Sequence, residues 1–322
     1  MMIIRSVTLF KRLLPNHNNL TVIMLCLFFT TQVSGQLSYT KNQHLEPAYE
    51  GWWENADGTF SFIFGYFNEN WDEELDIDIG DNNFFSPGDS DRGQPTHFLP
   101  RRNRFTFEVV VPADWGDQEL VWEVTSPNGE TRRAYATLAI DYIIDNVVIA
   151  SETGSLGAGT SSPESRANIA PTVELIGDEV RTTRTGEAVE IITRVVDDGI
   201  PEPRRSRARN TEEVFRERML NPPSRITVGK RNGLFLSWNV YRGPEQAQDN
   251  VHFDPPQVKP WEDTRTSANS PWGALWMPPA VPEDGIYTTS VTFDTPGTYV
   301  LWGRADDGGL YTDRYLTINV LP

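Results

Sequence analysis

The stretch VTFDTPGTYV at Val291–Val300 fixes how two strands of this chain meet. Its first residues alternate apolar and polar side chains, which is the pattern of a strand with one buried face. The Pro-Gly pair at 296–297 then makes a turn, because proline presets its own φ and glycine accepts a positive φ. The alternation resumes after the turn, so residues 286–293 and 298–305 are predicted to be two consecutive strands.

Short alternating runs of the same kind recur along the rest of the chain and divide into two blocks. In the first block the clearest run places Phe60, Phe62, Phe64 and Tyr66 on one face, and Asn128-Gly129 marks a hairpin turn. The predicted strands outside the opening stretch are 59–67, 105–111, 120–124, 131–140, 171–175, 188–196, 234–241 and 315–321. No helical periodicity is sustained, so the sequence predicts an all-β protein with two β-sandwich domains.

The second block resembles an immunoglobulin-like domain of the PKD or cadherin-like kind that occurs in secreted bacterial proteins. The ending F-x-x-P-G-x-Y at 293–299 carries the resemblance, together with ADDGG at 305–309, which leads into the last strand. It implies an immunoglobulin-like sandwich over residues 170–322, in which Tyr299 ties the turn to the next strand through its hydroxyl. The first block, and the chain as a whole, is similar to uncharacterised secreted bacterial proteins.

Composition shifts divide the chain into segments. A small, polar stretch rich in Gly, Ser and Pro separates the blocks, so we expect an N-terminal domain at 36–141, a linker at 142–170 and the immunoglobulin-like domain at 171–322. Two insertions interrupt the second domain. The first, about 201–230, holds a basic run at 204–209 and a capping-box pattern that predicts a helix at 211–220. The second, about 243–284, is rich in proline and tryptophan.

The N-terminus carries the three parts of an export signal. Three basic residues and no acidic one lie in the first 19 positions, residues 20–29 (LTVIMLCLFF) are uncharged, and small residues precede Gln36. This apolar run is too short to cross a bilayer, which needs about 20 residues. We therefore expect a signal peptide at 1–35, a secreted or periplasmic protein, and no stable membrane insertion after cleavage.

Charge and cysteine content exclude several classes of function. The chain has 45 Asp and Glu against 28 Lys and Arg, a net charge of −17, and loss of the leader with its three basic residues would make this −20. Nucleic acids and anionic membranes need a cationic face, so nucleic acid is excluded as a partner. The only cysteine, Cys26, lies in the leader, which excludes disulfides, thiol catalysis and cysteine-based zinc sites in the mature chain.

Two Asp-Asp-Gly sequences suggest a cation site. They follow the strands at 188–196 and 298–305, and the loops after these strands emerge at the same end of an immunoglobulin-like sandwich. Carboxylates crowded there repel one another unless a cation intervenes, and calcium prefers several oxygen ligands. The candidate calcium ligands are Asp197, Asp198, Asp306 and Asp307. The alternatives are plain Asp-Gly turns with solvated side chains, or neutralisation by Arg304 or Arg314.

Other polar and aromatic groups leave alternatives open. The first block holds a group of acids without EF-hand spacing, which are either the wet face of a strand or a second calcium site: Asp76, Asp78, Asp81, Asp89 and Asp91. The tryptophans near the blocks either form exposed platforms for sugar rings or pack the second insertion onto its sandwich: Trp52, Trp53, Trp261, Trp272 and Trp276. The three histidines beyond the leader fit no catalytic motif, so structural or surface roles are expected: His44, His97 and His252.

These observations favour a secreted, non-catalytic binding or adhesion module. Its expected ligand is a glycan or another exported protein of the cell envelope, and calcium is the one cofactor that the sequence suggests. One alternative is an exported hydrolase with a carboxylate site in the N-terminal domain. The other alternative is a structural spacer at the envelope.

Overall fold

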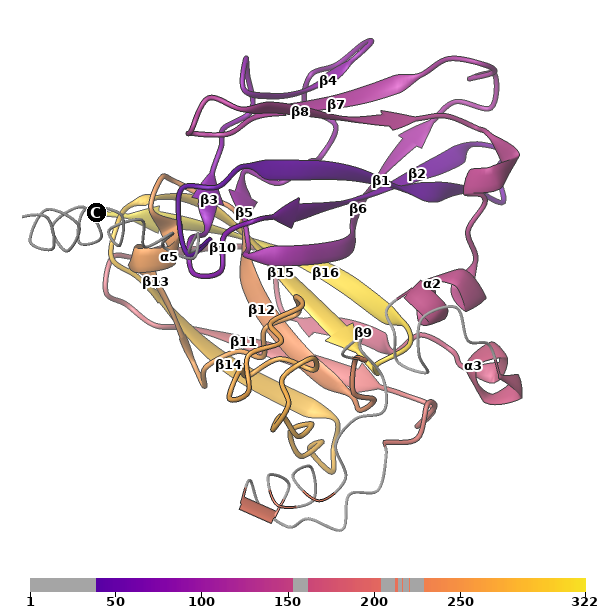
Figure 1. The fold of residues 1–322 in the computed structure, drawn as a ribbon. Helices are drawn as coiled ribbons and strands as arrows, with labels where there is room; N and C mark the ends of the chain where they lie inside the picture. The colour runs from indigo at the N-terminus through magenta and orange to yellow at the C-terminus, as the bar shows by residue number, and fades with distance from the viewer. Residues whose placement is uncertain (1–38, 153–161, 204–211, 214–215, 217–219, 221–228) are drawn as a thin grey trace, which may run out of the picture. The chain divides into compact units, whose positions relative to one another are not determined.

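The computed structural model describes residues 39–152, 162–203, 212–213, 216, 220 and 229–322 (Figure 1). Residues 39–322 form one compact unit. The export leader at 1–35 with Cys26, the basic run at 204–209 and most of the helix expected at 211–220 lie outside the described residues and stay predictions. Within the described ranges, no helix is both long enough and apolar enough to cross a membrane.

The first block pairs two small antiparallel sheets face to face (Figure 1). One sheet has the order β1-β2-β6 and the other has the order β4-β7-β8, while β3 and β5 form a short separate ladder. The bounds are β1 (Leu45–Glu54), β2 (Phe60–Asn68), β3 (Leu75–Asp76), β4 (Asn83–Ser86), β5 (His97–Phe98), β6 (Arg101–Val111), β7 (Leu120–Thr125) and β8 (Thr131–Ala136). The predicted strands of this block are confirmed, although β8 ends four residues earlier than expected.

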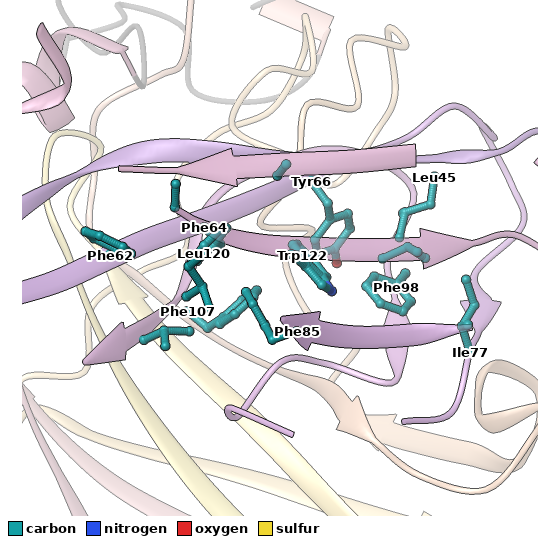
Figure 2. Packing of buried hydrophobic residues seen from close by; sticks show 14 of the residues in the cluster. Leu45, Phe62, Phe64, Tyr66, Ile77, Phe85, Phe98, Phe107, Leu120 and Trp122 are labelled. Atoms are coloured by element: carbon teal, nitrogen blue, oxygen red, sulfur yellow. The ribbon is translucent and has the colours of Figure 1, made fainter. Parts of the chain in front are cut away.

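Aromatic rings fill the space between these two sheets (Figure 2). Phe62, Phe64 and Tyr66 project from one face of β2, as the alternation predicts. They meet Trp122 of β7 in the same core. The ring centroids of Trp122 and Phe64 are 5.9 Å apart, and the two rings meet edge-on. The indole N–H donates to Oδ1 of Asn83 at 3.0 Å, so the polar atom of this buried ring is satisfied.

The described part of the segment between the blocks contains three short helical elements. They are η1 (Ile140–Tyr142), α2 (Asn146–Glu152) and α3 (Pro163–Ala167). Ile144 and Ile149 are buried in a small cluster that also contains Phe105 of the first block and Leu310 of the second. The described part of the segment 142–170 is therefore anchored at these two isoleucines, and the domain boundaries at 141 and 171 stay predictions.

The second block is an immunoglobulin-like β-sandwich with the sheet orders β13-β14-β11-β9 and β10-β16-β15-β12. The bounds are β9 (Thr172–Ile176), β10 (Val180–Arg184), β11 (Val189–Val196), β12 (Phe235–Arg242), β13 (Val251–Asp254), β14 (Ile286–Phe293), β15 (Gly297–Asp306) and β16 (Tyr311–Leu321). In this fold β9, β11, β14 and β13 correspond to strands A, B, E and D of an immunoglobulin domain, and β12, β15 and β16 correspond to strands C, F and G. The additional strand β10 pairs in parallel with β16.

The opening stretch of the sequence forms the corner that it predicts. The Tyr299 hydroxyl donates to the backbone carbonyl of Thr295 at 3.0 Å, which is a tyrosine corner at the start of β15. Its ring packs against Phe293 of β14, with centroids 4.6 Å apart. Trp238 of β12 is fully buried in the same core.

The second insertion, 243–284, is more ordered than its composition suggests. It begins with the short helix α5 (Ala247–Asn250) and continues into β13, which pairs with β14 at the edge of the sheet. Trp261, Trp272 and Trp276 are all buried. Trp276 packs edge-on against Phe235 of β12, whereas Trp261 joins the aromatic core of the first block. Because all three rings are buried, they provide no exposed platform.

Candidate binding cleft

The sheet β10-β16-β15-β12 is buried on both faces where the first block covers it. Alternation along β15 and β16 points Leu301 and Leu316 into the immunoglobulin-like core. Trp302 and Tyr241 point the other way and belong to the aromatic core of the first block. A sheet face that is commonly wet in an antiparallel sandwich is thus joined to a second hydrophobic core.

An open cleft of about 360 Å³ remains beside this covered face. Its lining residues come from both blocks: Gly93, Phe107, Glu108, Tyr241, Arg242, Val300 and Tyr315. Tyr315 is 40% exposed, and its ring meets that of the buried Tyr241 edge-on with centroids 5.0 Å apart. The size falls within the range of about 300–1,000 Å³ that is typical of small-molecule sites.

Hydrogen bonds hold the polar groups of the cleft in place. Arg242 binds Asp91 through Nη1 and Nη2 at 3.0 and 2.7 Å, and its Nε donates to the carbonyl of Gln94 at 2.8 Å. The Arg242 hydrogen bond lowers the pKa of Asp91. The Tyr241 hydroxyl donates to the carbonyl of Gly93 at 2.5 Å, and burial raises the pKa of this phenol.

Arg304 fastens the two blocks together next to this region. Its Nη2 donates to the backbone carbonyl of Phe105 at 2.6 Å and its Nη1 to that of Arg104 at 3.2 Å, both on β6. Nε and Nη2 also bind the carboxylate of Asp313 at 2.8 Å. A cavity beside Arg304 and Lys230 measures only about 20 Å³, which is room for about one water. It is too small for an organic ligand.

Among the predicted calcium residues, Asp306 is paired with a lysine. The Lys230 Nζ lies 2.6 Å from both carboxylate oxygens, and both side chains are buried. The Gly308 N–H donates to Oδ1 at 2.7 Å. Lys230 therefore supplies the positive charge next to Asp306. The sequence suggested calcium, Arg304 or Arg314 for this role, but Arg304 pairs with Asp313.

Asp307 is buried beside this pair. Its Oδ1 accepts hydrogen bonds from the N–H groups of Gly309 at 2.6 Å and Leu310 at 2.8 Å. Its Oδ2 has no hydrogen-bond partner among the described residues. Burial and the neighbouring charge of Asp306 raise the pKa of Asp307 to about 7.

The other two predicted calcium residues lie in a loop of the same end of the sandwich. Asp197 accepts from the N–H of Gly199, and Asp198 accepts from that of Ile169 at 3.1 Å. The loop after β11 and the loop after β15 are close to each other, as expected. A methyl group added at Gly309 would lie only 3.5 Å from Cδ of Pro201. Within the described part of the chain, no three of the four aspartates bring ligand atoms within 4.8 Å of one another. Calcium binding stays a prediction.

Two of the five predicted acids of the first block are held in ion pairs, Asp91 by Arg242 and Asp76 by His97. His97 is buried between Asp76, 2.6 Å from its Nδ1, and Glu74, 2.6 Å from its Nε2. Burial alone would lower the pKa of His97, but these two carboxylates raise it to about 9. The second oxygen of Asp76 accepts from the N–H of Gln246, which ties this ion triad to the second block.

The residues of the cleft carry no signal in the sequence that identifies them as a site. Phe107 and Val300 read as ordinary alternating strand residues, and Tyr241 ends a predicted strand. Tyr315 begins one. Only the register of β15 and β16, which places Tyr315 opposite Trp302, puts this tyrosine on the face that meets the first block.

Comparison with known proteins gives likenesses at low identity. No protein-family model matches the chain, and no curated protein matches it. Similar solved structures include the adhesin InvE of Yersinia pseudotuberculosis, with 13% identity and a TM-score of 0.24, covering 86% of this chain and 58% of that one. Domains 4 and 5 of the S-layer protein SbsC are 10% identical with a TM-score of 0.22, and the match covers 87% of this chain and 98% of that one. The fibronectin(III)-like modules of Clostridium thermocellum CbhA are 8% identical with a TM-score of 0.20, and the match covers 81% of this chain and 85% of that one. The chain spans less than two thirds of the InvE chain.

Proposed function

We propose that this protein is an exported, non-catalytic binding module that holds a glycan in the cleft around Tyr315. The observation that carries the proposal is a half-open cleft of about 360 Å³ with a partly exposed tyrosine on its wall. Such a ring offers a flat apolar surface and a hydroxyl in the same side chain. The carbon face of a sugar ring would stack on it.

The polar groups of the cleft match a hydroxylated, uncharged ligand. Arg242 offers N–H donors, and Glu108 offers carboxylate acceptors on an exposed side chain. Arg242 and Tyr241 are already fixed by Asp91 and Gly93, so little side-chain freedom is lost when a ligand binds. The net charge of −17 disfavours an anionic polymer as the ligand.

The lining of the cleft favours binding over hydrolysis. Glycoside hydrolysis typically needs two carboxyl groups that flank the scissile bond. Glu108 is the one carboxylate among the seven residues that line the cleft. Asp91 is held by Arg242, and Asp76 is held by His97, so both serve as ion-pair partners. A hydrolase site in the first block therefore has less support than a binding site.

The leader pattern at 1–35 supports a secreted or periplasmic location, where glycans of the envelope are accessible. The test is a screen of soluble oligosaccharides and insoluble polysaccharides for a rise in melting temperature and for co-sedimentation. Binding of at least one sugar class that depends on Tyr315 supports the proposal. Binding of an exported protein at the same face, without any sugar, would support the alternative ligand. Failure to bind either would favour a structural spacer.

A further inference from the structure

A second cluster of polar side chains surrounds His44, and none of its members lines the cleft. His44 directly precedes β1 and Glu46 lies two residues further on, so both side chains leave the same face of the strand. The Glu69 N–H donates to the carbonyl of His44 at 3.2 Å, which continues the β1–β2 pairing and places Glu69 opposite the histidine. Glu130, from the turn between β7 and β8, approaches the same ring.

The distances around the imidazole divide these carboxylates into two kinds. Glu46 Oε1 lies 2.7 Å from Nε2, a hydrogen bond that assigns the ring proton to Nε2 and leaves the lone pair of a neutral ring on Nδ1. Nδ1 faces oxygens of Glu69 at 3.8 Å and Glu130 at 3.6 Å, which are too long for hydrogen bonds. Ligand atoms of His44, Glu46 and Glu69 all lie within 4.8 Å of one another.

We propose that Nδ1 of His44 and the carboxylates of Glu69 and Glu130 form a binding site for a divalent transition metal, zinc in the first instance. Nitrogen and oxygen ligands bind zinc at about 2.0–2.2 Å in a tetrahedron, which separates them by roughly 3.3–3.5 Å. The separations at Nδ1 are close to this value. Glu46 holds the other ring nitrogen, as a carboxylate commonly does behind a metal-bound histidine. An imidazole among the donors favours zinc over calcium or magnesium, which prefer oxygen.

Arg132 is the cation that now compensates part of this negative charge. Its Nε binds Glu46 at 2.8 Å and its Nη2 binds Glu130 at 2.6 Å. The side chains of Arg132 and Glu130 are substantially exposed, at 37% and 48%, whereas that of His44 is 13% exposed. A metal ion would take over the role of Arg132 by small movements of exposed glutamates around a nearly buried ring.

The test is isothermal titration of zinc chloride into the untagged chain after treatment with a chelator. The expected result is one zinc ion per chain. His44→Gln and Glu69→Gln should each weaken binding by about ten- to a hundredfold. Arg132→Gln should tighten binding, because it frees Glu130 and removes a competing positive charge. Cobalt in place of zinc should give the intense visible absorption of a tetrahedral site.

His252 provides the matched control, because its ring contacts a single carboxylate, Asp294, at 2.9 Å. His252→Gln should bind zinc as the wild type does. Each variant is first checked for a wild-type circular dichroism spectrum, and Glu69→Gln carries the test if His44→Gln does not fold. The proposal is overturned if the wild type takes up no zinc below millimolar concentration, or if the folded variants bind it with wild-type affinity.

Discussion

Arg304 of β15 donates a 2.6 Å hydrogen bond to the backbone carbonyl of Phe105 in β6, across 199 positions of the sequence. The guanidinium is buried, lies 3.8 Å from the Tyr311 ring centroid, and pairs with Asp313 of β16. The Arg304 side chain thus links β15 to the neighbouring strand β16 through Asp313 and also binds β6 of the first block. The contact between the blocks therefore depends on a buried ion pair as well as on the shared aromatic core.

Replacing Arg304 with methionine should destabilise the whole unit. Removal of one partner leaves Asp313 uncompensated in a largely buried place, which typically costs about 3–5 kcal/mol. The midpoint of urea unfolding, followed by tryptophan fluorescence, measures this loss. The matched control is Arg314→Met, since Arg314 is exposed and donates only to the backbone carbonyl of Asp313. Equal midpoints for the two variants would contradict the role of Arg304.

His97 should make stability depend on pH in the alkaline range. Because Asp76 and Glu74 raise its pKa to about 9, the folded state holds its proton more tightly than the unfolded chain does. The stabilisation is fully present below the unfolded pKa of about 6.5 and is lost as pH rises through about 9. The free energy of unfolding should fall by roughly 3 kcal/mol over this interval. Denaturant titrations at pH 6.5 and 9.5 measure this loss.

The His97→Gln variant should be less stable at pH 6.5 and lose little more on going to pH 9.5. His252→Gln, which alters an exposed histidine, should retain the wild-type pH dependence. A His97→Gln profile parallel to that of the wild type would assign the alkaline loss to other groups.

Local patterns in the sequence predict the strands whose two faces differ in polarity. The alternation in β2 and the Pro-Gly turn before Tyr299 lead directly to the observed structure. The strands β1 and β10 were not predicted, for two different reasons. Pro47 and Gly51 interrupt β1, where the register shifts between Tyr49 and Gly51. The strand β10 (VRTTR) is polar and mostly exposed, so no hydrophobic pattern marks it.

The cleft and the ion pairs could not be predicted, because they depend on contacts between distant parts of the chain. Tyr315 belongs to a face that alternation marks as wet, and only the first block covers that face. The loops that carry Asp198 and Asp307 lie close together, as the topology of the sandwich predicts. The position of Lys230 could not be predicted, because it lies in an insertion whose path no periodicity indicates.

The calcium prediction has a direct test in melting temperature. An ion that binds the folded state only should stabilise it by about 2.7 kcal/mol at a hundredfold excess over the dissociation constant. This corresponds to a rise in Tm of about 5 °C, which a chelator should reverse. Calcium has to displace the Lys230 ammonium from Asp306, so the double change Asp306→Asn with Asp307→Asn should abolish the response. If millimolar calcium and chelator both leave the wild-type Tm unchanged, Lys230 is the group that neutralises Asp306.

Limited proteolysis tests the predicted division of the chain. Cleavage should occur first within 142–170 or 201–230, and the products should include fragments near 36–141 and 171–322. The buried contacts of Arg304 and Trp302 should keep the nicked fragments together in gel filtration under native conditions. Early cleavage inside β2 or β15, with both segments intact, would show that the boundaries are misplaced.

Tyr315 gives the most direct test of the proposed function. Isothermal titration should show that the sugar class found by screening binds the wild type and that Tyr315→Ala loses about 1–3 kcal/mol, or roughly 5- to 150-fold in affinity. The matched control is Tyr135→Ala, because Tyr135 of β8 is 53% exposed and does not line the cleft. We expect wild-type affinity for the control and a loss confined to Tyr315→Ala. Equal sugar affinity in the wild type and a folded Tyr315→Ala variant would contradict it.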